Sequence, residues 1–137
     1  MGDDSRPHGF RFAVNVSAHL MRASAGVLLI AGLALLFAAD VILPRVIPEF
    51  PAAGAWFGQL LGGAWLGVAA LDWLSKGARL GGIYGRPIVL MNLILYFVSA
   101  IVLLKIALLP GASTVVGVSA IVFGAFAALF GWLMFRG

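Results

Sequence analysis

Four long apolar runs determine what this chain can fold into. They cover approximately residues 23–43, 54–75, 88–109 and 114–135. Each run is close to the ~20 residues that a helix needs to cross about 30 Å of hydrocarbon. None alternates in polarity as a barrel strand does, and a helix satisfies its backbone hydrogen bonds internally. The runs predict an all-α integral membrane four-helix bundle, a single transmembrane domain over residues 1–137.

The composition excludes several classes of protein. Hydrophobic residues make up 63 % of the chain and charged residues 10 %, whereas soluble domains are about half apolar and about a quarter charged. The chain has no cysteine, which excludes disulfides, iron–sulfur clusters and zinc–thiolate sites. Its net charge of +4 comes from basic residues beside the apolar runs, which favours contact with membrane lipids over nucleic acid.

Proline and glycine mark the connections between the runs. Pro44, Pro48 and Pro51 follow the first run, so we expect its helix to end there. The second connection, residues 76–87, contains four glycines. The third, residues 110–113, is so short that the third and fourth helices must be antiparallel neighbours.

The residues before the first run have an amphipathic pattern. Apolar residues recur at helical spacing between positions 10 and 22, with polar residues between them. The pattern fits a short interfacial helix, or equally an early start of the first membrane helix.

Lysine and arginine are distributed unevenly between the two ends of the runs. Seven would lie on one side and two on the other, and this bias predicts that both termini are cytoplasmic. The seven are Arg6, Arg11, Arg22, Lys76, Arg79, Arg86 and Arg136, and the two are Arg45 and Lys105.

Small residues recur at regular spacing in three of the runs and predict helix-packing faces. They are Gly54, Gly58, Gly62 and Gly67 in the second run, Gly117, Gly124 and Gly131 in the fourth, and Ala25, Gly32 and Ala39 in the first. Such faces let two helices approach closely in lipid. They would pack within one bundle or between copies, and their abundance favours a homo-oligomer.

Asp40 and Lys105 are the ionisable residues near the outer ends of the first and third runs. Their depths match, so we expect them to form an intramembrane pair. Gln59 and Ser119 fall at a similar depth and would complete a polar pocket. Alternatively, the two charged side chains reach separately to the outer headgroups.

A second polar group lies at the cytoplasmic end and contains Asp72, Lys76, Arg79, Arg86 and Asn92. Asp72 and Lys76 are four residues apart, which places them on one helix face as a charge pair. The arginines would then contact anionic lipid headgroups. Alternatively, the group forms a binding patch for an anionic headgroup or substrate.

The sequence offers little for catalysis. It has no Ser/His/Asp constellation and no His/Asp/Glu cluster with metal-ligand spacing. We therefore expect no enzymatic activity, no metal and no cofactor.

The segment from residue 59 to 105 resembles a type of small bacterial inner-membrane protein of unknown function. The resemblance rests on the Leu-Gly-Gly-Ala run at 61–64, Asp72-Trp73-Leu74, the loop Gly-Gly-Ile-Tyr-Gly-Arg-Pro at 81–87, and Asn92. A looser similarity to DoxX-like four-helix membrane proteins rests on Arg22, Gly26 and the run at 28–32. The resemblance implies a bacterial inner (plasma) membrane location and no particular activity.

Three functions remain open on the sequence. The favoured one is a non-catalytic integral membrane protein, either a self-associating bundle or an accessory subunit of a larger membrane complex. The second is a small oligomeric transporter or channel, and the third is a lipid- or quinone-binding membrane protein.

Overall fold

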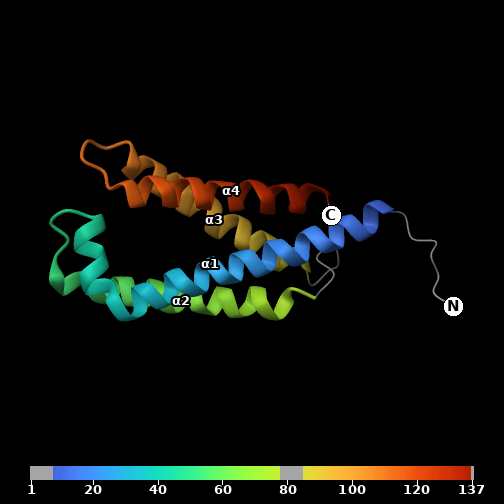
Figure 1. The fold of residues 1–137 in the computed structure, drawn as a ribbon, viewed down its shortest axis with the longest axis horizontal. Coiled ribbons are helices and arrows are strands. Elements are labelled where there is room, and N and C mark those ends of the chain that lie inside the picture. Colours follow the sequence, from blue (N-terminus) through green and yellow to red (C-terminus); the bar gives the residue numbers. More distant parts are fainter. Residues whose placement is uncertain (1–7, 78–84, 137) are drawn as a thin grey trace.

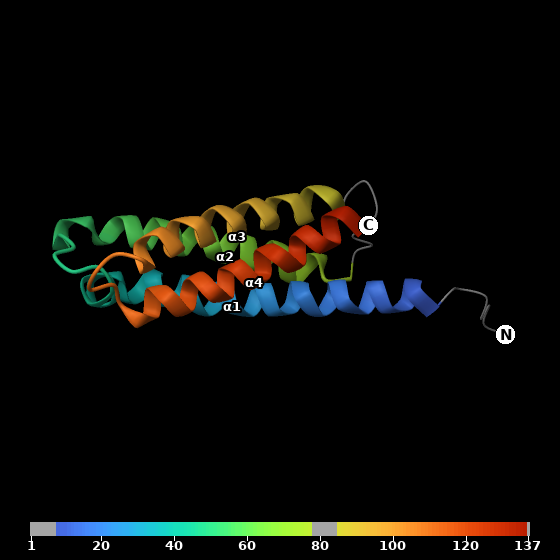
Figure 2. The ribbon, with the colours of Figure 1, turned by 90° about the horizontal axis from the view of Figure 1, so that it is seen from above.

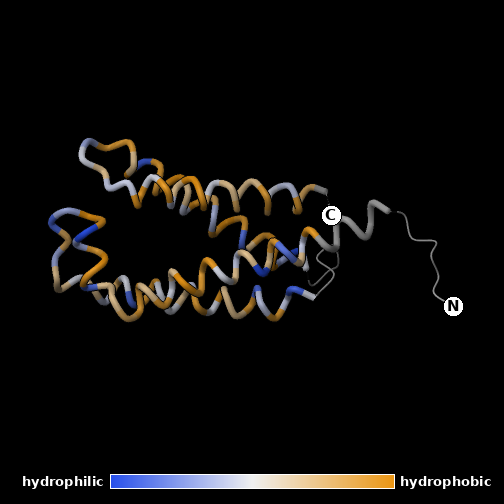
Figure 3. Tube along the Cα trace, viewed as in Figure 1, coloured by the Kyte–Doolittle hydropathy of each residue, from blue (hydrophilic) through white to orange (hydrophobic). Residues whose placement is uncertain are grey.

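The computed structural model describes residues 8–77 and 85–136, and within these ranges the chain is helical apart from its turns and has no strand. The elements are α1 (His8–Val46), the short 3-10 helix η1 (Ala52–Gly54), α2 (Ala55–Ser75), α3 (Gly85–Ala107) and α4 (Thr114–Arg136). By length and composition, four helices could cross a membrane, and Figure 3 shows apolar residues along most of their length. The all-α prediction is confirmed.

Helix α1 is longer than the first apolar run. It begins at His8 and continues to Val46 with one departure from helical backbone geometry, at Ala38 (φ −135°, ψ 24°). Of the two alternatives for residues 10–22, the structure therefore shows an early start of the first long helix and not a separate interfacial helix. The helix ends at Val46, within the proline-containing segment 44–51 where the sequence predicts its end, although Pro44 itself lies inside the helix. Proline removes only its own N–H, and the N–H of Ile47 still donates to the carbonyl of Leu43 at 2.8 Å.

The helices form two hairpins, α1 with α2 and α3 with α4, with a smaller contact between α1 and α4. The four helices run along one long axis (Figure 2). In Figure 1 the hairpins diverge towards the end that carries η1 and the α3–α4 turn, and converge towards the other end. The turn uses Gly111 in the left-handed region (φ 80°). Ser113 then caps α4, because its Oγ accepts a hydrogen bond from the N–H of Val115 at 3.3 Å.

Backbone contact between small residues holds α1 against α2. A Cβ built on Gly62 would lie 2.7 Å from the carbonyl oxygen of Gly32, and one on Gly32 would lie 2.9 Å from that of Gly62. One turn away, a Cβ on Gly58 would lie 2.9 Å from that of Ala39. These residues must be small because the two backbones occupy the space that a side chain needs.

Adjacent glycines on α2 provide a test of this contact. We expect Gly62→Ala to destabilise the protein by about 1–3 kcal/mol, because the added Cβ meets backbone atoms that can move only with their helix. Gly63→Ala is the matched control, since nothing lies within 4 Å of a Cβ there. Unfolding in lipid bicelles measures both, and equal stability of the two variants would contradict the close contact.

Candidate functional site

A cluster of four buried side chains with polar groups lies where the two hairpins converge. Ser24 comes from α1, Asp72 from α2, and Asn92 and Tyr96 from α3. Each has an exposed fraction of 0 %. The cluster therefore joins three helices in the interior of an otherwise apolar bundle.

Hydrogen bonds connect the four side chains in a line. The hydroxyl of Ser24 donates to Asp72 Oδ2 at 2.5 Å, and Asn92 Nδ2 donates to Asp72 Oδ1 at 2.6 Å. The hydroxyl of Tyr96 lies 2.7 Å from Ser24 Oγ. Since the proton of Ser24 is directed to Asp72, Tyr96 is the donor in that pair. The carboxyl group thus accepts from two neutral donors, and two of the three bonds cross between the hairpins.

Asn92 uses both of its amide protons but leaves its side-chain oxygen without a hydrogen bond. Its Nδ2 also donates to the carbonyl oxygen of Ile88 at 3.1 Å, so both amide protons are used. Its Oδ1 is buried and accepts no hydrogen bond. A buried acceptor without a partner costs free energy, and such groups in native proteins call for a physical explanation.

Aromatic rings of α4 enclose the Tyr96 end of the cluster. The Tyr96 ring stacks on Phe126 with centroids 4.7 Å apart and on Phe130 at 5.7 Å. Phe123 contacts it edge-on at 5.2 Å and also lies 5.6 Å from the Trp65 ring of α2. Water is thereby excluded from this side of the cluster.

The structure brings together part of the predicted cytoplasmic patch. Asp72 and Asn92 are in direct contact. Lys76 does not pair with Asp72, because its Nζ lies 3.2 Å from the centroid of the Trp73 ring instead. Arg86 is exposed, and Arg79 lies outside the described residues.

The predicted pair of Asp40 and Lys105 is not formed. Both side chains are exposed, and they belong to different hairpins at the end where the hairpins diverge. Gln59 is exposed on α2 and Ser119 is half-buried on α4, so the expected polar pocket is not assembled either. The physical reason is that the two hairpins diverge at this end, so polar residues of different hairpins are not brought together there.

Sequence reasoning missed Ser24 and Tyr96. Tyr96 follows Asn92 by four residues and therefore shares its helix face, which is a signal that the spacing contained. No spacing in the sequence marks Ser24 in this way. The only indication is that a buried carboxyl group such as Asp72 needs hydrogen-bond donors from neighbouring helices.

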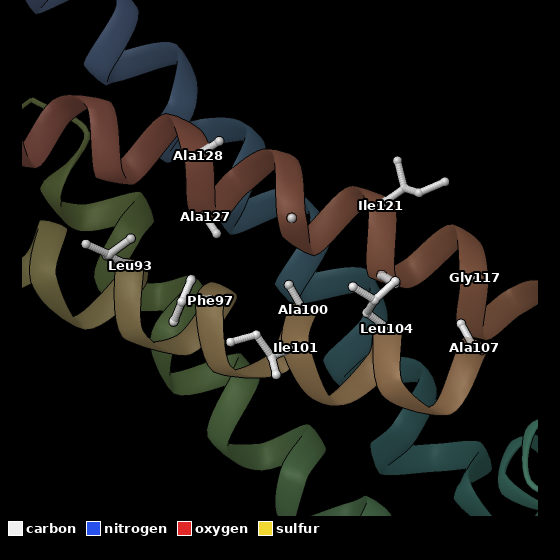
Figure 4. A pocket seen from close by; sticks show the side chains of 12 residues that line it. Leu93, Phe97, Ala100, Ile101, Leu104, Ala107, Gly117, Ile121, Ala127 and Ala128 are labelled. Atoms are coloured by element: carbon white, nitrogen blue, oxygen red, sulfur yellow. The ribbon is translucent and has the colours of Figure 1, made fainter. Parts of the chain in front are cut away.

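A groove runs between α3 and α4 on the outside of the bundle (Figure 4). Its volume is about 780 Å³, within the ~300–1,000 Å³ range of ligand pockets. All its lining residues are apolar: Leu93, Phe97, Ala100, Ile101, Leu104, Ala107, Gly117, Ala120, Ile121, Gly124, Ala127 and Ala128.

The predicted packing glycines therefore divide into distinct groups. Gly58 and Gly62 lie in the α1–α2 contact described above. Gly54 is instead close to the ring of its neighbour Phe50, and a Cβ on Gly131 would make ordinary contact with Leu93. A Cβ built on Gly67, Gly117 or Gly124 would meet nothing within 4 Å. The seam on α4 is thus open at Gly117 and Gly124, while Ala120 and Ala127 between its glycines are buried.

Comparison with known proteins adds no assignment: no family model, no curated protein and no solved structure matches this chain. The resemblances drawn from the sequence remain predictions.

A double-mutant cycle tests the central contact of the cluster. We expect Asn92→Leu to lower the free energy of unfolding by about 1–3 kcal/mol, because it leaves a buried oxygen of Asp72 without its donor. In an Asp72→Leu background the same change should cost much less, since no carboxyl group remains. Unfolding in bicelles measures each variant. If the two changes add within about 0.5 kcal/mol, the side chains do not interact.

Proposed function

We propose that the protein is a non-catalytic integral membrane protein whose bundle associates with a second copy of itself through the α3–α4 groove. The observation that carries this proposal is the open apolar groove, with Gly117 and Gly124 on its α4 side. In lipid, association of helices depends on close packing of such faces rather than on hydrophobic burial.

The contrast between two seams of one chain supports the proposal. On α2 Gly58 and Gly62 are covered by α1, and the backbones meet at Gly32 and Gly62. On α4 a Cβ at Gly117 or Gly124 would meet nothing within 4 Å, whereas Ala120 and Ala127 of the same seam are buried in the chain itself. The first seam shows how this chain uses such a face, and the glycines of the second leave part of a similar face open.

The spacing of the α4 seam favours a second copy as the occupant. Gly117, Gly124 and Gly131 are seven residues apart, with Ala120 and Ala127 between them. Across a two-fold axis along the membrane normal, two parallel α4 helices would place the same positions opposite each other. A seven-residue repeat keeps such a seam in register in a left-handed crossing.

We propose a bacterial inner membrane as the location, with both termini in the cytoplasm. The distribution of lysine and arginine supports this orientation. It would place the Asp72 cluster nearer the cytoplasmic surface, and the divergent ends of the hairpins at the outer surface.

Cysteine cross-linking in native membranes tests the proposal, since the chain has no cysteine of its own. We expect Gly124→Cys to form a disulfide-linked species of about twice the 14.3 kDa chain mass under mild oxidation. Gly63→Cys is the matched control, because it lies on α2 with equally open surroundings and should remain monomeric.

A filled groove should abolish the association without unfolding the chain. We expect Gly124→Leu to weaken self-association at least about tenfold, which is ~1.4 kcal/mol, and to leave the helix content unchanged. Gly63→Leu should leave association unchanged. A monomeric Gly124→Cys protein with lipid or another polypeptide retained at the groove would contradict self-association and favour a lipid-binding protein or an accessory subunit.

A further inference from the structure

The buried polar residues all lie towards one end of the bundle. In the part of the chain that the structure describes, the buried polar or charged residues are Ser17, Ser24, Asp72, Ser75 and Asn92. Ser17 and Ser24 are two helical turns apart on one face of α1, and Ser75 follows Asp72 by one turn at the end of α2. The three buried serines and Asp72 thus lie towards the end where α2 and α3 are joined.

The opposite side of the cluster is closed by aromatic rings. Tyr96 is packed against Phe123, Phe126 and Phe130, and Trp65 lies against Phe123. The indole Nε1 of Trp65 is itself buried without a partner, so no polar path continues there. Apolar rings therefore close the cluster on this side.

The hydrogen bonds around Asp72 suit its ionised form. Both donors point their protons at the carboxylate, which accepts and does not donate. These donors are neutral, however, and a charge in an apolar interior is costly without a cation. A protonated Asp72 would need a hydrogen-bond acceptor in the place of the Asn92 donor. Asn92 Oδ1, which accepts no hydrogen bond in the structure, would provide that acceptor if the amide group turned over and exchanged the places of its oxygen and nitrogen.

We propose that Asp72 is a proton-binding site that exchanges one proton with water at the end of the bundle where α2 and α3 are joined. Hydronium gives its proton to Asp72 Oδ1 and leaves as water, and the reverse step returns the proton to water. In the ionised state Asn92 Nδ2 donates to Oδ1, as the structure shows. In the protonated state the amide is turned, and Oδ1 of Asp72 donates to Oδ1 of Asn92.

Proton binding would act on the contact between the hairpins. The bond between Asp72 and Asn92 joins α2 to α3, and the line from Asp72 through Ser24 to Tyr96 joins the same two hairpins. Asn92 is a positioning residue in this scheme, and Asp72 carries the proton. The scheme does not depend on the α3–α4 groove.

Among the side chains that the structure describes, few other titratable or charged groups are near Asp72. On α3 the titratable group nearest the cluster is Tyr96, whose hydroxyl is connected to Asp72 by hydrogen bonds through Ser24. Arg86, near the start of α3, is exposed. On α1 His19 and Arg22 are exposed, and on α2 Lys76 lies over Trp73. The side chains that α4 brings to the cluster are aromatic rings.

Infrared spectroscopy tests the proposal directly on the folded protein. The chain has four aspartates and one glutamate, so a variant with Asp3→Asn, Asp4→Asn and Asp40→Asn retains Asp72 as its only aspartate. With ¹³C-labelled aspartate in lipid nanodiscs, we expect one carboxylic acid C=O band per chain that appears on acidification and disappears on return to alkaline pH. Asp72→Asn in the otherwise natural chain should remove one titrating carboxyl group, whereas Asp40→Asn should leave the Asp72 band.

Two results would overturn the proposal. One is a labelled carboxyl band that is present at every pH, or absent at every pH, while the helices remain folded. The other is a saturable effect of Na⁺ at fixed pH on the Asp72 band, which would make the cluster a metal-cation site. Since cross-linking at Gly124 reports on a separate surface, either proposal can fail without the other.

Discussion

The hydrogen-bonded carboxyl group of Asp72 is the constraint on which the arrangement of the helices depends. A polar group in an apolar interior must find its partners within the protein, and a helix cannot supply them from its own backbone. Asp72 finds its donors on two neighbouring helices, Ser24 on α1 and Asn92 on α3. Those bonds fix the rotation of α1, α2 and α3 relative to one another, and they hold together two hairpins that diverge at their far ends (Figure 1).

Small residues determine the second feature of the architecture, and they act in two ways. Between α1 and α2 they bring two backbones into contact, which leaves little freedom for that hairpin. On α4 the same kind of seam contributes to an open apolar groove. One hairpin is therefore closed by its own glycines, while the other carries an open apolar groove. The proposed self-association and the proposed proton site belong to these two different parts of the molecule.

The sequence allowed part of the site to be predicted. Asp72 and Asn92 belong to one predicted polar group at the same end of their runs, and the structure joins them. The same reasoning paired Asp40 with Lys105, which the structure leaves exposed and apart. Equal depth is necessary for a contact but not sufficient, because it says nothing of the direction in which a side chain points or of the distance between two helices. Lys76 shows the same limit, since spacing placed it beside Asp72 while its ammonium group lies over Trp73.

By itself the sequence determined that the chain forms four long helices, where they end to within a few residues apart from the early start of α1, and that the last two are antiparallel. These properties depend on hydropathy and backbone hydrogen bonding along a single segment, which can be seen in the order of residues. The tertiary structure alone decided which polar groups meet, which glycine seam is closed, and where the hairpins diverge. Within the four apolar runs the helices are apolar on nearly all sides, so no amphipathic pattern marks their inward faces there. Their rotation is fixed by contacts between residues far apart in the chain, such as Ser24 with Asp72 and Gly32 with Gly62.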